Sequence, residues 1–110
     1  MTAETENLVG DFLDVVATIV AKPGRGGAVA ELLSGVLDSV RAEPGCLRYD
    51  LFRVRHDDDT LMMVEQWASK GDLKAHGASE HFVALSARMG PELAEAPVVR
   101  VLVPVGRVAT

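Results

Sequence analysis

The sequence is poor in aromatic residues, has a single cysteine and lacks long apolar runs, and each shortage excludes a class of protein. Aromatic residues make up 5 % of the 110 residues. Cys46 has no partner for an internal disulfide, so we expect a small, buried thiol in a reducing compartment. No segment approaches the roughly 20 consecutive apolar residues of a membrane span. Residues 1–6 are acidic and no apolar run follows them, unlike a signal peptide. We therefore expect a cytoplasmic protein with no membrane partner.

Positive charge is also scarce. Lys and Arg total 11 against 16 Asp and Glu, giving a net charge of −5, which argues against a nucleic-acid partner. The length and the 48 % hydrophobic content fit one globular domain. We expect this domain over residues 14–105, between a flexible N-terminal tail (1–13) and a C-terminal tail (106–110).

Hydrophobic periodicity predicts the order strand, helix, strand, strand, helix, strand. The apolar stripe from Val29 to Val40 predicts one continuous first helix. The second helix begins with a capping-box-like Ser69 and Asp72, and we expect it to kink at Gly77 and Ala78. The glycine-containing stretch 22–27 lacks the spacing and the Lys-Ser/Thr ending of a phosphate loop, so it predicts a strand-to-helix turn. The remaining expected elements are strands 14–21, 46–55, 60–68 and 98–105, a turn at 56–59 and a helical piece ending at Met89.

This order is typical of the α+β ferredoxin-like fold, βαββαβ, with a four-stranded antiparallel sheet. Its helices lie on a single face of the sheet. The first strand should be central, because both of its faces are apolar, and the second should be an edge. The last strand is also apolar on both faces, so the sheet face without helices would be a large exposed apolar patch. We expect a second copy of the sheet to cover it in a homodimer.

The third strand carries an unusual carboxylate. Alternation places Leu61, Met63, Glu65 and Trp67 on one face. A buried glutamate needs hydrogen-bond donors. Glu65 therefore either anchors neighbouring groups or orients a catalytic one, and the sequence leaves both roles open.

Two histidines follow on the second helix. His76 lies one turn after Leu73, and His81 adjoins Phe82. Their five-residue separation differs from the i, i+4 spacing of a helical metal pair, and no third soft ligand lies nearby, so we expect no metal site. These histidines lie opposite the strand that carries Glu65 and Trp67. Either imidazole could therefore act as a base in a pocket that binds a planar small molecule. The expected ring contacts are Trp67, Met63, Phe52 and Phe82, with Arg48 as a rim charge that could stabilise an oxyanion.

The chain resembles the antibiotic biosynthesis monooxygenase domain family over about residues 14–105. The likeness rests on Glu43-Pro44-Gly45-Cys46, Val64-Glu65-Gln66-Trp67, Ala75-His76, His81-Phe82 and Val101-Leu102-Val103-Pro104-Val105. The resemblance implies a dimeric α+β barrel that oxidises quinols or anthrone-like aromatics with O2, without flavin, haem or metal. Other members degrade haem or isomerise a phosphorylated sugar derivative.

Two departures favour the quinol-oxidising group of the YgiN type. Haem-degrading relatives place an asparagine on the first strand, where this chain has Val15-Val16-Ala17. Polyketide-type members can carry an asparagine four residues before the tryptophan, where this chain has Met63.

These features predict a cofactor-independent monooxygenase that oxidises a small quinol-like or enolisable aromatic substrate with O2. The expected catalytic residues are His76, His81 and Glu65. Two alternatives stay open: an isomerase or lyase that acts through an enediol, and a non-catalytic module that binds a small molecule.

Overall fold

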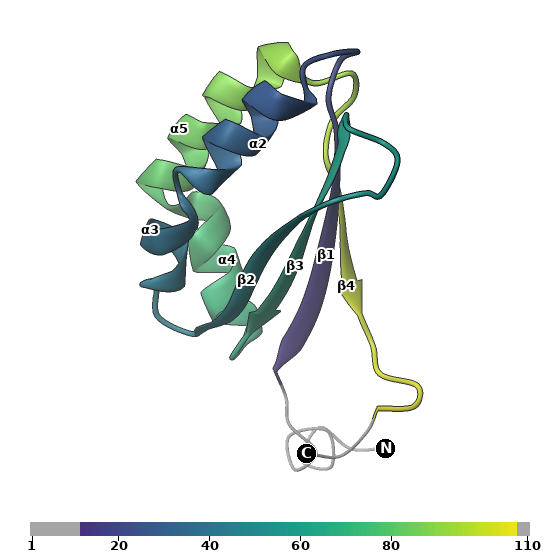
Figure 1. Ribbon diagram of the computed structural model, residues 1–110. Helices are drawn as coiled ribbons and strands as arrows, with labels where there is room; N and C mark the ends of the chain where they lie inside the picture. The colour runs from purple at the N-terminus through teal and green to yellow at the C-terminus, as the bar shows by residue number, and fades with distance from the viewer. Residues whose placement is uncertain (1–11, 108–110) are drawn as a thin grey trace.

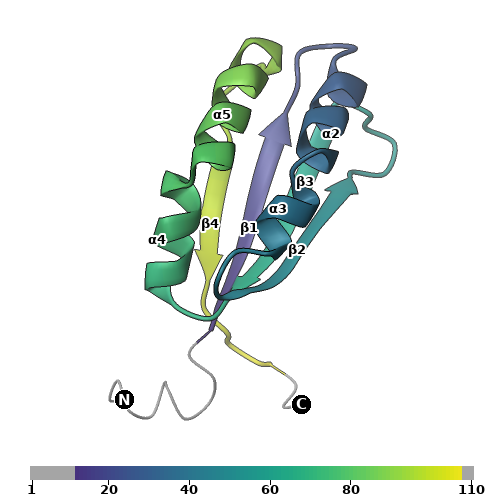
Figure 2. The same cartoon turned by 90° about the vertical axis from the view of Figure 1, so that its left-hand side faces the viewer.

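A four-stranded antiparallel sheet with its helices on one face makes up the protein (Figures 1 and 2). The structure is a computed structural model that describes residues 12–107. Its strands lie in the order β2-β3-β1-β4, so the predicted ferredoxin-like α+β fold is confirmed. The elements are β1 (Leu13–Val20), α2 (Gly26–Ser34), α3 (Leu37–Arg41), β2 (Cys46–Arg53), β3 (Thr60–Trp67), α4 (Lys70–Ala78), α5 (Glu80–Met89), the 3₁₀ turn η1 (Gly90–Glu92) and β4 (Val98–Leu102).

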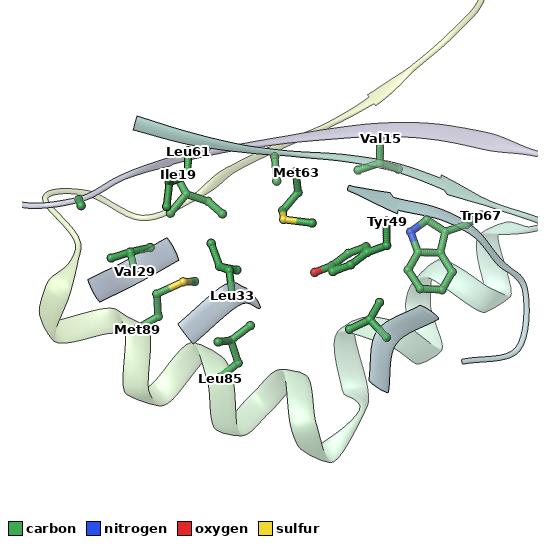
Figure 3. Packing of buried hydrophobic residues seen from close by; sticks show 13 residues of the cluster. Val15, Ile19, Val29, Leu33, Tyr49, Leu61, Met63, Trp67, Leu85 and Met89 are labelled. Atoms are coloured by element: carbon green, nitrogen blue, oxygen red, sulfur yellow. The ribbon is translucent and has the colours of Figure 1, made fainter. Parts of the chain in front are cut away.

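The core lies between the sheet and the helices. Alternation along β1 buries Val15, Ala17 and Ile19, and the antiparallel partners of these residues on β3 include Glu65 and Met63. Figure 3 shows these strands above the helices, with Leu33 and Leu85 reaching up towards them. β1 is central and β2 is an edge, as the sequence predicts. None of the helices in the described residues is long and apolar enough to cross a bilayer.

The prediction of one continuous first helix is wrong. The apolar stripe is present, but the chain breaks between α2 and α3 at Gly35 and Val36. The amide of Val36 bonds to the carbonyl of Leu33 at 3.2 Å, which is a tighter, three-residue turn. Ser34 and Gly35 are weak helix formers, which accounts for the end of α2 at this point.

Other boundaries shift by a few residues. β1 begins at Leu13, one residue before the predicted strand, and pairs Leu13 with Trp67. Residues 1–11 of the predicted N-terminal tail (1–13) lie outside the described residues, as do residues 108–110 of the predicted C-terminal tail. β4 ends at Leu102 instead of 105, since Pro104 cannot donate a backbone hydrogen bond.

The second helix also breaks one residue later than expected. Ser69 caps α4 and accepts a hydrogen bond from the amide of Asp72 at 3.1 Å, which confirms the capping prediction. The break falls at Ser79, whose backbone is extended (φ −66°, ψ 147°), rather than at Gly77 and Ala78. The Ser79 hydroxyl donates to the carbonyl of His76 at 2.8 Å and so closes the end of α4.

The glycine-containing stretch after β1 is a strand-to-helix turn, as predicted, and it binds a carboxylate of the protein itself. The amides of Gly24 and Gly26 donate to the two carboxylate oxygens of Asp59, at 3.0 and 2.9 Å. These bonds hold the pKa of Asp59 below its usual range. The turn between β2 and β3 is thereby tied to the start of α2.

Gly26 is required by this close approach. A Cβ atom at Gly26 would lie 1.8 Å from the carbonyl oxygen of Asp58, whereas one at Gly27 would meet nothing within 4 Å. We expect Gly26→Ala to lower the free energy of unfolding by roughly 1–3 kcal/mol through backbone displacement. The matched control Gly27→Ala should leave it unchanged or raise it by about 0.5–1 kcal/mol. Urea denaturation measures both, and equal midpoints for the two variants would contradict this account.

Candidate active site

Two histidines from consecutive helices converge on one carboxylate. Nδ1 of His76, on α4, lies 3.0 and 3.2 Å from the two carboxylate oxygens of Glu43. Nε2 of His81, on α5, contacts Oε2 of the same carboxylate. The Glu43 side chain is only 11 % exposed. The arrangement therefore places one buried acceptor between two imidazole rings.

The break at Ser79 brings the imidazoles together. Residues five apart on an unbroken α-helix lie about 140° apart around its axis and cannot meet on one partner. Because α4 ends at Ala78 and α5 starts at Glu80 in a new direction, His76 and His81 approach Glu43 from two sides. The five-residue spacing that argues against a helical metal pair is thus compatible with a shared carboxylate. No cluster of three or more potential metal ligands occurs within residues 12–107.

Glu43 sits on a turn between α3 and β2. Its amide bonds to the carbonyl of Val40 at 2.9 Å, and its carbonyl accepts from the amide of Cys46 at 3.2 Å. Gly45 has a positive φ of 77°, and a Cβ there would lie 2.1 Å from the Asp72 carboxylate. The Gly45 carbonyl also accepts from the amide of Ala68 at 2.8 Å. The turn is therefore bonded to the residue that follows β3 and lies against the start of α4.

Aromatic rings enclose His76. Its ring centroid lies 4.7 Å from that of Trp67, 4.5 Å from that of Phe82 and 5.4 Å from that of Tyr49. Trp67 is 0 % exposed. The sequence suggests a ligand pocket beside the Trp67 indole, but the imidazole of His76 occupies that space. Figure 3 shows Tyr49 and Trp67 side by side at one end of the core.

Glu65 supports the indole. Its Oε1 accepts from Nε1 of Trp67 at 2.9 Å, and the residue is 6 % exposed. Burial raises the pKa of Glu65 above its ordinary value, and the indole hydrogen bond opposes that shift. Burial likewise raises the pKa values of Tyr49 and Cys46. The surroundings of the cluster thus disfavour additional negative charge.

A groove of about 460 Å³ opens between α2 and α5, next to His81. The two imidazoles differ in access to it, since the side chain of His81 is 35 % exposed and that of His76 is 5 % exposed. His81 lines the groove and His76 does not. The groove is lined by Glu31, Leu32, Gly35, Val36, His81, Ala84, Leu85 and Arg88.

The remaining sequence-predicted residues lie elsewhere. Met63 is 1 % exposed and packs in the core. Phe52 pairs with Met62, so it lies on the outer face of the sheet, which we define as the face without helices. Arg48 pairs with Gln66 on that face and forms an ion pair with Asp50 at 2.7 Å. A separate hollow of about 300 Å³, lined by β1, β3 and residues 102–107, includes neither histidine.

Sequence reasoning missed Glu43 as a site residue. Its partners lie 33 and 38 residues away, so no local spacing connects them. Glu43 was recognisable only as part of the Glu43-Pro44-Gly45-Cys46 motif, where the proline and glycine account for the turn without assigning a role to the carboxylate.

Comparison with known proteins relates the chain to a described family. A family model described as "Antibiotic biosynthesis monooxygenase" matches residues 13–88. The protein named "Putative monooxygenase Rv0793" of Mycobacterium tuberculosis is 32 % identical over 90 residues, which is 82 % of this chain and 88 % of that protein. "Putative monooxygenase YcnE" of Bacillus subtilis is 32 % identical over 81 residues, covering 74 % of this chain and 84 % of that protein.

Solved structures agree with the fold. The crystal structure of PA3566 from Pseudomonas aeruginosa has a TM-score of 0.79 at 35 % identity, over 86 % of this chain and 95 % of that one. The structure of Rv0793 also has a TM-score of 0.79, at 30 % identity, over 87 % of this chain and 97 % of that one. The β-sheet and helices that carry the candidate site therefore have close structural counterparts.

The raised pKa of Glu65 predicts a pH-dependent contribution to stability. A group whose folded-state pKa is raised stabilises the fold fully below its unfolded pKa and loses that contribution as pH rises through the folded pKa. Glu65→Gln keeps an oxygen acceptor for the Trp67 N–H but has no proton to lose. We expect the free energy of unfolding of the variant, minus that of the wild type, to increase from about pH 4 to about pH 7. Urea denaturation across this range measures the difference. The exposed control Glu95→Gln should show a smaller change, and an equal change in both variants would contradict the assignment.

Proposed function

Because the chain belongs to the antibiotic biosynthesis monooxygenase family, we propose that it is a cofactor-independent monooxygenase acting on a small quinol-like or enolisable aromatic substrate with O2. The observation that carries this proposal is the position of His81, whose imidazole contacts a buried carboxylate and which also lines the α2–α5 groove. An imidazole held by a carboxylate next to a small-molecule-sized groove is suited to proton abstraction.

The groove is suited to a planar, mostly apolar molecule. Its volume of about 460 Å³ lies within the range of roughly 300–1,000 Å³ that small-molecule sites occupy. Leu32, Val36 and Leu85 supply apolar walls, and Gly35 leaves space because it has no side chain. The substrate ring lies between α2 and α5 in this proposal, with a hydroxyl group directed at His81.

The proposed chemistry starts with removal of a hydroxyl proton. A neutral imidazole ring has a lone pair on one of its two nitrogens and can accept this proton. The resulting quinolate is electron-rich and reduces O2 directly. One oxygen atom enters the ring and the other leaves as water, so a quinol and O2 become a hydroxyquinone and water. All four electrons come from the substrate, and no cofactor has to supply any.

The other cluster residues act through His81 in this proposal. His76 bonds to the same carboxylate, while Trp67 and Phe82 hold the His76 ring in place. Glu65 anchors the indole. Of the two histidines, His81 is the base and His76 supports it, because His81 alone of the pair lines the groove.

The proposal includes a homodimer that covers the outer face of the sheet. Phe52 is 47 % exposed on this face, and β4 is exposed on both of its faces, with Val99 at 58 % and Leu102 at 45 %. Phe52 and Leu102 lie on the two edge strands of this face, and Val64 and Val16 lie between them on β3 and β1, so apolar side chains extend across the outer face. A surface of this kind commonly marks an interface. A second copy packed sheet to sheet would cover it and leave the α2–α5 groove, which lies in the helix layer, open.

We expect His81→Ala to reduce O2 consumption with a panel of hydroquinones by about 10²-fold or more, since a general base contributes on that order. His76→Ala should retain more activity than His81→Ala, because His76 does not reach the groove. An oxygen electrode in metal-free buffer provides the measurement. Unchanged rates in both variants would remove the histidine base from the mechanism.

Two glycine substitutions, one inside the groove and one outside it, test where the substrate binds. A Cβ at Gly35 meets only ordinary contacts, at 3.5 Å and beyond, so Gly35→Leu should fold and occupy the groove. Gly27→Leu, in the first turn of α2 and outside the groove, should retain wild-type turnover. Turnover that continues without O2 would support the enediol isomerase instead, and binding without turnover would support a non-catalytic module.

The dimer has its own test. We expect Phe52→Glu to shift the protein from dimer to monomer in sedimentation equilibrium, because it buries a charge in the proposed interface. Val83 is 56 % exposed on α5, so Val83→Glu makes a comparable change away from the outer face and should leave the dimer intact. A wild-type protein that sediments as a monomer would contradict the proposed interface.

A further inference from the structure

We propose that Glu43 is the positioning residue of the site, and that it sets the tautomer of His81 so that Nδ1 is the ring nitrogen that accepts the substrate proton. This inference rests on the proposed function for its catalytic consequence, but its structural part can be tested without any substrate. It begins with the contact between Nε2 of His81 and the Glu43 carboxylate.

The donor and acceptor roles follow from elementary chemistry. An ionised carboxylate can only accept hydrogen bonds, so each imidazole nitrogen that faces it must carry a hydrogen. His81 therefore has its hydrogen on Nε2 when the ring is neutral, and the lone pair is on Nδ1, at the other side of the ring. His76 faces the carboxylate with Nδ1, so its hydrogen lies on that atom. The same carboxylate thus imposes opposite tautomers on the two rings.

His76 keeps the carboxylate from turning away. Its ring lies within 4.7 Å of Trp67 and 4.5 Å of Phe82, measured between centroids, and is 5 % exposed, so it has little freedom to rotate. Its Nδ1 lies within hydrogen-bond distance of both oxygens of Glu43. A carboxylate held in this way offers a fixed acceptor to His81, whose own side chain is partly exposed.

The backbone around Glu43 supports the same geometry. The turn that carries Glu43 is bonded to Ala68 through the Gly45 carbonyl, and Gly45 packs against Asp72 at the start of α4. The position of the acceptor is therefore set by the sheet and by the helix that carries His76. Preorganised acceptors of this kind lose little energy to reorientation when a proton is transferred.

The charge balance also favours this role. When His81 takes a proton from the substrate, the imidazolium lies against a carboxylate that is 11 % exposed, and the pair is neutral overall. Without Glu43 the new positive charge would have no buried counter-charge among the contacts that the ring makes in the described residues. Glu43 thus both orients His81 and stabilises its protonated form, although it does not touch the substrate.

Nitrogen NMR of the imidazole rings tests the structural part. In wild-type protein with both rings neutral, we expect the hydrogen of His81 on Nε2 and that of His76 on Nδ1. In Glu43→Gln we expect a mixture of tautomers for at least His81, because a single amide oxygen replaces two carboxylate oxygens. Wild-type His81 with its hydrogen on Nδ1, or an unchanged His81 tautomer in Glu43→Gln, would overturn the inference. The wild-type spectrum decides the question even if the variant does not fold.

Kinetics with a quinol that the wild type oxidises tests the catalytic part. We expect Glu43→Gln to lower kcat by about 10²-fold or more with little change in KM, because the groove itself is intact. Glu43→Asp, which keeps the carboxylate, should recover part of kcat. The exposed control Glu95→Gln should behave as wild type. Loss of activity in Glu43→Gln without a change in the His81 tautomer would indicate a merely structural role and overturn the proposal. If no quinol is oxidised, the proposed function fails while the NMR result still stands.

Discussion

The site depends on one carboxylate shared by two imidazoles. Glu43 can accept from both rings because three separate backbone features coincide: the turn at Gly45, the cap of α4 at Ser69 and the break between α4 and α5 at Ser79. Each feature is unremarkable alone. Together they bring His76 and His81, which lie 33 and 38 positions after Glu43 in the sequence, onto this single acceptor. The aromatic packing around His76 follows from that arrangement.

The two faces of the sheet differ in how far their apolar side chains are buried. The inner face carries Val15, Met63 and Trp67 into a filled core, so the groove beside His81 lies farther out, between two helices. The outer face has no helix over it and keeps apolar side chains accessible. Chemistry in the helix layer and association through the sheet can therefore coexist in a small domain, since neither needs the other's surface.

Much of the fold could be predicted from sequence because it depends on local patterns. Period-two alternation indicates the buried face of β3, and the Ser69 cap follows from residue type. Arg48 shows why other placements could not be predicted. Cys46 and Arg48 are two apart and would share a face in a regular strand, but an irregularity between them pairs Cys46 with Trp67 and Arg48 with Gln66. This shift turns Arg48 and Phe52 away from the histidines. Glu43 was missed for a different reason, since its role depends on long-range contacts.

The stacking of His76 on Trp67 has a spectroscopic consequence. Trp67 is the only tryptophan in the sequence, and its ring lies 4.7 Å from the imidazole, centroid to centroid. A positive charge on an imidazole at this range interacts with the indole π-system and quenches its emission. The intrinsic fluorescence of the protein is therefore an optical reporter of the charge on His76, a ring that solvent hardly reaches.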